Sequence, residues 1–452
     1  MLLSIEKLIY GGDGLARTAA GPDGRSMAVF VPFVLPGEQV EADLERRKGF
    51  SRASLTNVVE ASSDRIQPRC PYFLHCGGCH YQHIPYDLQL RFKSEILHET
   101  LQRIAKIELK SEIKLHPSPA WKYRNRTRLQ VQTAPEFALG YFKFGSHELL
   151  PVRECPISSP LLNKVMARMI ELKGLSCPDA IAEMELFADA EDGHLLAWAF
   201  CQRDADPAIL QRWAASIQQE IPEVSGVTFF ASRHGLRART ERQDSRNEVN
   251  NNEDELSDSK LLASCGAASI QYQTANAAYR VSAGAFFQVN RHLVDDLIAT
   301  VTGKATGDTA LDLYAGVGLF SAALARSFHH IFGVEASLTS HRDFTHNVPT
   351  NVKAIAARTE DYLSRDHFPN ELRRKRLDLI VLDPPRSGAG KKVISSIVGL
   401  GAPLIRYVSC DPATLARDLA PLMAAGYRIE EAHLFDMFPG TFHIESVMLL
   451  AR

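Results

Sequence analysis

The spacing of apolar residues divides the chain of 452 residues into regions of different character. In residues 1–60, short apolar stretches alternate with polar positions and are interrupted by turn residues at 11–12, 21–24 and 36–38. Alternation with a period of two, broken by turn residues, predicts short β-strands. We therefore expect residues 1–60 to form an all-β domain, and a five-stranded barrel of the oligonucleotide-binding (OB) type would fit them.

Residues 61–285 form a second region, for which we expect a β-rich central domain. A helical period runs from 86 to 106, and its apolar face consists of Leu90, Ile96, Leu97, Leu101 and Ile104. Residues 241–260 are polar with few apolar positions, which predicts a mobile surface loop.

From residue 286 to the end, strand and helix signals alternate, which predicts an α/β domain with a doubly wound parallel sheet. In such sheets, ligands bind at the carboxyl ends of the strands, so polar residues at strand ends are the candidates for binding and catalysis. The expected strands cover 309–314, 331–335, 377–383, 404–408 and 446–450, and the expected helices include 321–326 and 413–425.

Composition narrows the class of protein. The chain is 45% hydrophobic and 23% charged, as in globular proteins, and its net charge of −2 excludes a uniformly basic nucleic-acid binder. It has no run of about 18 apolar residues and no signal-peptide pattern at its amino terminus, so we expect no membrane span. Eight cysteines do not suggest a disulfide scaffold in a chain of this length. We expect a cytoplasmic monomer, in which clustered cysteines are metal ligands.

Three cysteines, Cys70, Cys76 and Cys79, lie close together in the sequence. Packing alone does not readily explain this spacing, and it predicts a shared metal centre. Cys155 is the best candidate for the fourth ligand. Four thiolates suit either zinc or an iron–sulfur cluster, and the spacing does not separate the two.

A basic stretch at 121–130 is a candidate for nucleic-acid binding. In a strand, its four alternating cations would share one face, where they would favour phosphate contacts. The alternative is a solvated edge strand. The four residues are Lys122, Arg124, Arg126 and Arg128.

Cys410 is the candidate nucleophile, because it lies at the end of a predicted strand and near the amino terminus of a predicted helix. The partial positive charge at a helix amino terminus favours the thiolate, and Arg386 is a further candidate cation. The alternative is a buried structural cysteine. Glu445 begins the last predicted strand after a Pro-Gly turn, and it is either a surface acid or a base. Such a pair suits methylation of uracil, in which a thiolate adds to carbon 6 and a base removes the proton from carbon 5.

A glycine turn and three polar residues are candidates for binding an adenosine-type cofactor. A glycine turn follows Asp312, although dinucleotide enzymes share that feature. Glu335 suits a ribose diol and is otherwise a surface acid. Asp383 precedes two prolines and either binds cofactor, orients the uracil edge or caps the turn. Gln288 follows two phenylalanines and is otherwise a polar strand end.

Together these motifs resemble the RNA (uracil-5-)-methyltransferase family, in the iron–sulfur branch that makes 5-methyluridine in 23S rRNA. The resemblance spans nearly the whole chain and implies a Rossmann-like methyltransferase domain over 286–452 and an RNA-binding TRAM barrel over 1–60. It also implies a catalytic nucleophile and base, four contacts to S-adenosyl-L-methionine, and four ligands of a [4Fe-4S] cluster. The nucleophile and base are Cys410 and Glu445. The cofactor contacts are Gln288, Tyr314, Glu335 and Asp383. The cluster ligands are Cys70, Cys76, Cys79 and Cys155.

Three positions depart from the family pattern, namely Gly440 near the base, Asp411 beside the nucleophile and Leu319 in the glycine loop. The leading hypothesis is methylation of uridine carbon 5 in 23S rRNA. The alternatives are the same reaction on tRNA, a non-catalytic RNA-binding iron–sulfur protein, and a nicotinamide oxidoreductase, which leaves Cys410 and Glu445 unexplained.

Overall fold

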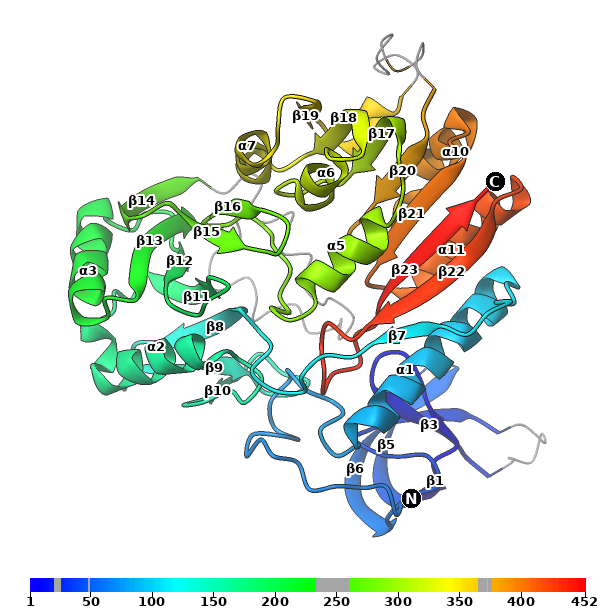
Figure 1. Ribbon diagram of the computed structural model, residues 1–452. Helices are drawn as coiled ribbons and strands as arrows, with labels where there is room; N and C mark the ends of the chain where they lie inside the picture. Colours follow the sequence, from blue (N-terminus) through cyan, green and yellow to red (C-terminus); the bar gives the residue numbers. More distant parts are fainter. Residues whose placement is uncertain (20–25, 48, 233–259, 365–371, 373–375) are drawn as a thin grey trace.

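The computed structural model describes residues 1–19, 26–47, 49–232, 260–364, 372 and 376–452. It contains three large β-sheets, shown in Figure 1 with the helices that cover them. The polar loop predicted at 241–260 lies outside the described residues, except for Lys260.

The N-terminal region is rich in strands, as predicted, but its sheet has six strands and not five. Its core is made of alternating residues such as Val29 and Val31, which are fully buried. The order is β1-β5-β6-β4-β3-β2, formed by β1 (Leu2–Ser4), β2 (Lys7–Leu8), β3 (Asp13–Arg17), β4 (Ala28–Pro32), β5 (Gln39–Arg47) and β6 (Phe50–Glu60).

The middle sheet has seven strands in the order β10-β9-β8-β11-β12-β13-β14. The helices α2 (Pro160–Glu171) and α3 (Pro207–Glu220) share a core with it. The side chain of Ser159 caps the start of α2, and that of Asp206 caps the start of α3. In each helix the next residue is a proline. The strands are β8 (Arg126–Gln132), β9 (Ala138–Phe142), β10 (Leu149–Pro151), β11 (Ile181–Ala188), β12 (Leu195–Cys201), β13 (Val224–Ala231) and β14 (Leu261–Gly266). A separate hairpin consists of β15 (Ser269–Gln273) and β16 (Ala278–Ser282).

The basic stretch at 121–130 is neither a strand with four cations on one face nor an edge strand, so both predicted placements are wrong, whereas phosphate contact stays a prediction. The strand begins only at Arg126 and lies inside the sheet, between β9 and β11. Arg126 Nε donates to Glu185 Oε1 at 2.5 Å, and its guanidinium lies 4.7 Å from the ring centre of Trp198. Arg128 Nε likewise donates to Glu183 Oε2 at 2.7 Å. Lys122, with φ +56°, and Arg124 precede the strand.

The C-terminal sheet has eight strands in the order β19-β18-β17-β20-β21-β23-β22-β7. The first five are mutually parallel, as predicted, and β23 is inserted antiparallel to both of its neighbours. The edge strand β7 comes from the predicted central region, whose boundaries stay a prediction. The strands are β17 (Gly307–Leu313), β18 (Phe328–Glu335), β19 (Val352–Ala356), β20 (Leu379–Leu382), β21 (Leu404–Ser409), β22 (Arg428–Phe435), β23 (Glu445–Ala451) and β7 (Lys114–His116).

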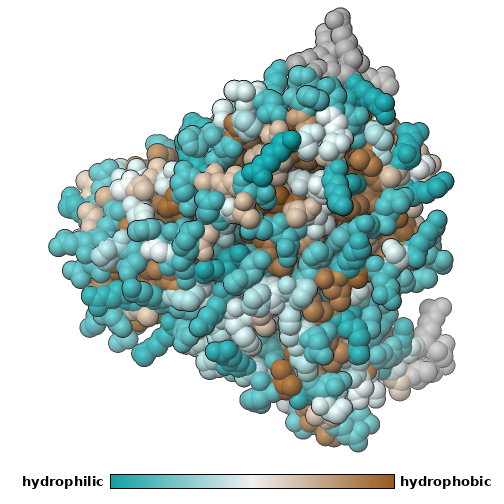
Figure 2. Space-filling model, viewed as in Figure 1, coloured by the Kyte–Doolittle hydropathy of each residue, from teal (hydrophilic) through white to brown (hydrophobic). Residues whose placement is uncertain are grey.

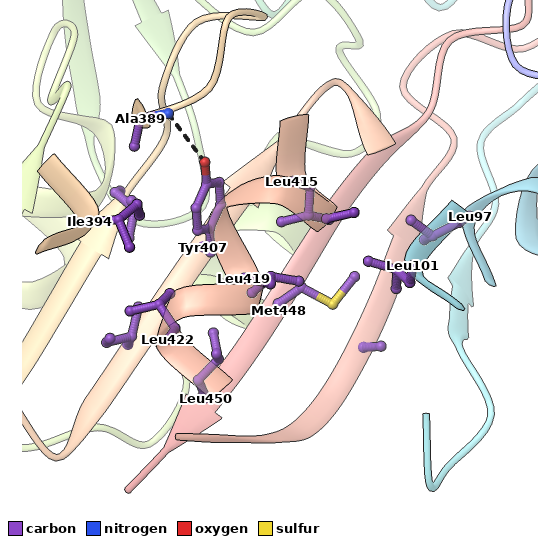
Figure 3. Packing of buried hydrophobic residues seen from close by; sticks show 14 of the residues in the cluster. Leu97, Leu101, Ala389, Ile394, Tyr407, Leu415, Leu419, Leu422, Met448 and Leu450 are labelled. Atoms are coloured by element: carbon purple, nitrogen blue, oxygen red, sulfur yellow. Dashed lines mark hydrogen bonds between the residues drawn. The ribbon is translucent and has the colours of Figure 1, made fainter. Parts of the chain in front are cut away.

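Helices cover both faces of this sheet, because its strands are apolar on both sides. One core contains α1, η1, α10 and α11, and the other contains α5 and α6. In Figure 3, Leu415, Leu419 and Leu422 of α11 lie over Met448 and Leu450 of β23. The helices are α1 (Tyr86–Thr100), continued by the π-helical turn η1 (Leu101–Ala105), α5 (Val294–Thr302), α6 (Leu319–Leu324), α7 (Leu338–Asn347), α8 (Thr359–Tyr362), α10 (Gly390–Leu400) and α11 (Pro412–Ala424).

The face of the molecule seen in Figure 2 is mostly hydrophilic, with apolar side chains in separate groups. In the part of the chain that the structure describes, no helix combines the length and the apolar character needed to cross a membrane.

Asp312 is a fully buried carboxyl group in β17, two residues before the glycine turn begins at Tyr314. Ser321 Oγ donates to its Oδ2 at 2.6 Å, while Oδ1 has no hydrogen-bond partner among the described residues. Burial raises the pKa of Asp312 to about 7. The folded protein therefore keeps a proton at this site that the unfolded chain releases near its ordinary pKa of about 3.9.

This difference predicts that Asp312 weakens the folded state as the pH rises from about 4 to about 7, where only the unfolded chain has released the proton. The free energy of unfolding of the wild type, measured relative to that of Asp312→Asn by urea titration, should fall across this window and level off above it. Asp308→Asn, at an exposed position of the same strand, is the control. A difference between wild type and Asp312→Asn that does not change with pH would contradict the raised pKa.

Candidate active site

The candidate nucleophile and base lie at the same edge of the C-terminal sheet. In the antiparallel pair of β21 and β23, Ser409 is the partner of Ser446. Continuing this register by one residue sets Cys410 opposite Glu445. Ser446 Oγ also donates to the carbonyl oxygen of Ser409 at 3.2 Å, which holds the two strand ends together. Cys410 is partly exposed and Glu445 is 7% exposed, so a partly accessible cysteine lies opposite a buried glutamate.

Asp411 fixes the start of the helix that follows the thiol. Its Oδ1 accepts hydrogen bonds from the backbone N–H of Ala413 at 3.0 Å and of Thr414 at 2.8 Å. This is the N-cap arrangement, and Pro412 occupies the first helical position. The departure at Asp411 is therefore compatible with a well-formed helix terminus, whose partial positive charge lies next to Cys410.

Arg386 and His443 form a hydrogen-bonded pair near this edge. The loop that carries Arg386 is tied to α11, because Thr414 Oγ1 donates to the Arg386 carbonyl at 3.1 Å. Arg386 Nη2 lies 3.2 Å from His443 Nδ1, and a guanidinium only donates, so this nitrogen accepts and the imidazole is neutral. Burial, and then the charge of Arg386, hold the pKa of His443 well below its usual value. The sequence offered no separate signal for His443.

The segment before β23 is held by buried polar contacts. Gly440 has φ +77°, a left-handed conformation that favours glycine over the histidine usual in the family. Its N–H donates to Gln89 Oε1 at 2.8 Å, and its carbonyl accepts from the N–H groups of His80 and Tyr81, both at 2.9 Å. The departure at Gly440 thus accompanies a tight connection between this segment and the residues before and within α1.

Three of the four predicted cofactor contacts lie at the carboxyl edge of the parallel strands. Glu335 ends β18, and its two oxygens accept hydrogen bonds from Gly316 N at 2.8 Å and Ser337 N at 2.6 Å. Tyr314, with φ +63°, begins the glycine turn. Asp383 N donates to the carbonyl of Leu313 at 3.3 Å, which joins the end of β20 to the start of that turn.

The fourth residue, Gln288, lies on a separate segment that docks against the middle sheet. Its carbonyl accepts from Asn125 Nδ2 at 3.0 Å. Two residues later, the fully buried Asn290 donates through Nδ2 to the Met437 carbonyl at 3.2 Å. This segment is therefore connected to the loop that leads to Glu445. Leu319, the third departure, is buried at the start of α6, where its carbonyl accepts from Tyr279 Oη at 3.1 Å.

The four predicted metal ligands gather in one region between the N-terminal and middle sheets. Cys70, Cys79 and Cys155 belong to or border the same small buried cluster. Burial raises the pKa of Cys70, Cys76 and Cys79, and the charge of Cys155 raises all three further. Within the described residues, however, no group of three or more His, Cys, Asp or Glu side chains forms a metal-binding arrangement.

Comparisons with known proteins show which family the chain resembles. A family model described as tRNA (Uracil-5-)-methyltransferase matches residues 267–452. The chain is 32% identical to the 23S rRNA (uracil(1939)-C(5))-methyltransferase RlmD of Halomonas elongata, over 99% of this chain and 89% of that protein. It is 31% identical to an uncharacterized RNA methyltransferase of Streptomyces avermitilis, over 99% and 97% of the two chains.

A solved structure shows the same mixed α/β fold. It is that of Pyrococcus abyssi tRNA (uracil-54, C5)-methyltransferase in complex with S-adenosyl-L-homocysteine, with a TM-score of 0.73, 22% identity and 99% of each chain covered. Relatives above 30% identity along nearly the whole chain confirm the family that the motifs predict. The chain therefore belongs to the RNA (uracil-5-)-methyltransferase family and is an enzyme of that class.

Proposed function

We propose that this enzyme transfers a methyl group from S-adenosyl-L-methionine to carbon 5 of a uridine in 23S rRNA, through a covalent adduct with Cys410. The observation that carries the proposal is the strand register that sets Cys410 opposite Glu445 at the ligand-binding edge of the sheet. Family membership removes the nicotinamide oxidoreductase from the alternatives.

In this mechanism, the Cys410 thiolate attacks carbon 6 of the uracil, and the electron pair of the double bond makes carbon 5 nucleophilic. Carbon 5 then takes the methyl group, and S-adenosyl-L-homocysteine leaves. Glu445 removes the proton from carbon 5, the double bond forms again, and the Cys410 sulfur leaves carbon 6. The helix terminus capped by Asp411 and the Arg386 guanidinium supply positive charge that favours the thiolate.

The cofactor would lie along the strand ends, in contact with Gln288, Tyr314, Glu335 and Asp383. The Glu335 carboxylate, oriented by two backbone N–H groups, suits the hydroxyls of the cofactor ribose. Asp383 follows β20, which lies between β17 and the strand β21 that leads to Cys410, so it suits either the cofactor or the edge of the uracil.

The names of the relatives support ribosomal RNA as the substrate, since the Halomonas elongata protein is a 23S rRNA methyltransferase. The names of the family model and of the Pyrococcus abyssi protein support tRNA as the second candidate. We assign RNA binding to a TRAM-like N-terminal sheet over 1–60 and to a central domain over 61–285, with the methyltransferase domain over 286–452 in a monomeric protein of the cytoplasm.

We assign a [4Fe-4S] cluster to Cys70, Cys76, Cys79 and Cys155. A single zinc ion needs its thiolates about 2.3 Å from one point, whereas a four-iron cluster takes each thiolate on a different iron and so holds them farther apart. This difference fits four cysteines of one region, in which the charge of Cys155 raises the pKa of the other three and no single-ion site forms among the described residues. The cluster would connect the 70–79 segment to Cys155 of the middle region.

The substrate can be identified by methylating RNA from a strain that lacks this enzyme. Purified enzyme with labelled S-adenosyl-L-methionine should label a uridine of 23S rRNA, mapped by mass spectrometry. The matched control is the same incubation with purified tRNA from that strain. Label in tRNA alone would replace the ribosomal proposal with the second candidate.

The covalent mechanism predicts opposite effects for two variants. RNA carrying 5-fluorouridine should trap an adduct with the wild type and with Cys265→Ala, a half-buried control thiol in β14, but not with Cys410→Ala. Glu445→Gln should retain the adduct with ordinary uridine, because proton removal is impaired, and its turnover should fall roughly 10²- to 10⁴-fold. Denaturing gels measure the adduct. Adduct formation by Cys410→Ala would refute the assignment of the nucleophile.

The cluster predicts about four iron atoms per chain in enzyme prepared without oxygen, with the visible absorbance of an iron–sulfur centre. Cys155→Ser should lower the iron content strongly, while Cys265→Ser, remote in sequence from all four cysteines, should leave it unchanged. Metal analysis that finds one zinc and no iron would contradict the assignment.

A further inference from the structure

Tyr10 connects the N-terminal sheet to the nucleophile. It lies in the turn between β2 and β3, and its hydroxyl donates a hydrogen bond to the carbonyl oxygen of Cys410 at 3.2 Å. The two residues are 400 positions apart in the sequence. A side chain from the first sheet therefore reaches the backbone of the residue that the proposed mechanism uses as nucleophile.

The turn that carries Tyr10 also packs against the segment before Glu445. The rings of Tyr10 and Phe442 meet edge to face, with centres 5.7 Å apart and planes at 89°. Two residues after Tyr10, the backbone of Gly12 lies close to the side chains of His80 and Phe442. A Cβ added at Gly12 would lie 3.2 Å from atoms of both. The absence of a side chain at Gly12 thus allows the turn to approach the segment before Glu445.

The docking of this turn is supported at its base. Leu8 in β2, two residues before Tyr10, belongs to the same buried core as Leu415 and Leu419 of α11. Lys7 Nζ also donates to Glu99 Oε1 of α1 at 2.5 Å. The position of the Tyr10 hydroxyl is therefore fixed relative to the helix that begins beside Cys410.

The surroundings of Tyr10 keep it a hydrogen-bond donor. Burial raises the pKa of its hydroxyl well above the usual value, and the charge of Asp411 raises it further, against a smaller opposing effect of Arg386. On the other side of the thiol, Ser409 Oγ donates to the Asp411 carbonyl at 3.1 Å. The peptide units around Cys410 are thus held by Ser409 from within their own turn and by Tyr10 from the N-terminal sheet.

We infer that Tyr10 is a positioning residue, through which docking of the N-terminal sheet sets the direction of the Cys410 thiol. The inference rests on the proposed function. A hydrogen bond to the Cys410 carbonyl restricts rotation of the peptide that follows, and with it the direction of the Cα–Cβ bond. Because a nucleophile must meet its target atom within a narrow range of positions, loss of this restraint lowers the rate of attack.

The test compares Tyr10→Phe with Tyr427→Phe in the full chain. Tyr427 is also buried and donates to a backbone carbonyl, that of Ala402 at 2.7 Å, but it lies at the opposite end of β21. Both variants lose one such bond, and Tyr10→Phe keeps its ring against Phe442. For Tyr10→Phe, kcat and the rate of adduct formation with 5-fluorouridine RNA should fall roughly three- to tenfold. KM for RNA should stay within about twofold, and Tyr427→Phe should keep wild-type kinetics.

A second measurement needs neither RNA nor cofactor. The rate at which iodoacetamide alkylates Cys410, followed by mass spectrometry, should change in Tyr10→Phe and not in Tyr427→Phe. Unchanged kcat and alkylation in Tyr10→Phe, equal losses in both variants, or a raised KM with unchanged kcat would each overturn the inference. If the wild type methylates no RNA but Tyr10→Phe still alters alkylation, the proposed function fails while the positional effect of Tyr10 stands.

Discussion

The antiparallel insertion of β23 is the constraint on which the chemistry depends. Every parallel strand brings only its carboxyl end to the ligand-binding edge, whereas β23 brings its amino end there, and with it Glu445. A shift of its register by one residue would turn every side chain of β23 to the other face. Val447 packs into the core on one face and Met448 into the core on the other, so a shifted register would require both cores to repack. The packing of the core therefore also sets the placement of the carboxyl group opposite the thiol.

The approach to β23 is determined by buried polar contacts rather than by regular structure. Lys93 Nζ and Asp436 Oδ1 form an ion pair at 2.6 Å with both side chains fully buried. Such a pair adds little net stability, because desolvation offsets the attraction, but the loss of one partner would leave a buried charge alone. Together with the hydrogen bonds of Asn290 and Gly440, this ion pair restricts the path of the loop between β22 and β23. A loop with few alternatives is suited to delivering Glu445 in one position.

The sequence predicts the parts of this fold that depend on local pattern. The strand ending at Ser409 and the helix from Pro412 agree with the predicted 404–408 and 413–425 to within one residue, because apolar period and turn residues define both. Contacts between distant segments were not predictable. The basic stretch was misread because the partners of Arg126 and Arg128 lie 59 and 55 residues away, on β11. The three residues of β7 carry too little pattern to reveal that they extend the C-terminal sheet.

The proposed mechanism needs an anion at Cys410, although the net charge of the chain is −2. Burial keeps His80 and His443 neutral, with the pKa of His80 lowered to about 4, so neither imidazole supplies a permanent positive charge. The favourable charge comes instead from fixed groups, namely the α11 terminus and Arg386, whose loop is hydrogen-bonded to Thr414 of the same helix. Because a guanidinium and a helix terminus do not titrate near neutral pH, the proposed stabilisation of the thiolate would depend on geometry rather than on the protonation of a neighbouring base. Two hydrogen bonds hold this geometry, one from Thr414 to Arg386 within the domain and one from Tyr10 to Cys410 from outside it. In the proposed mechanism, both would therefore affect the reactivity of Cys410 without contact to the substrate.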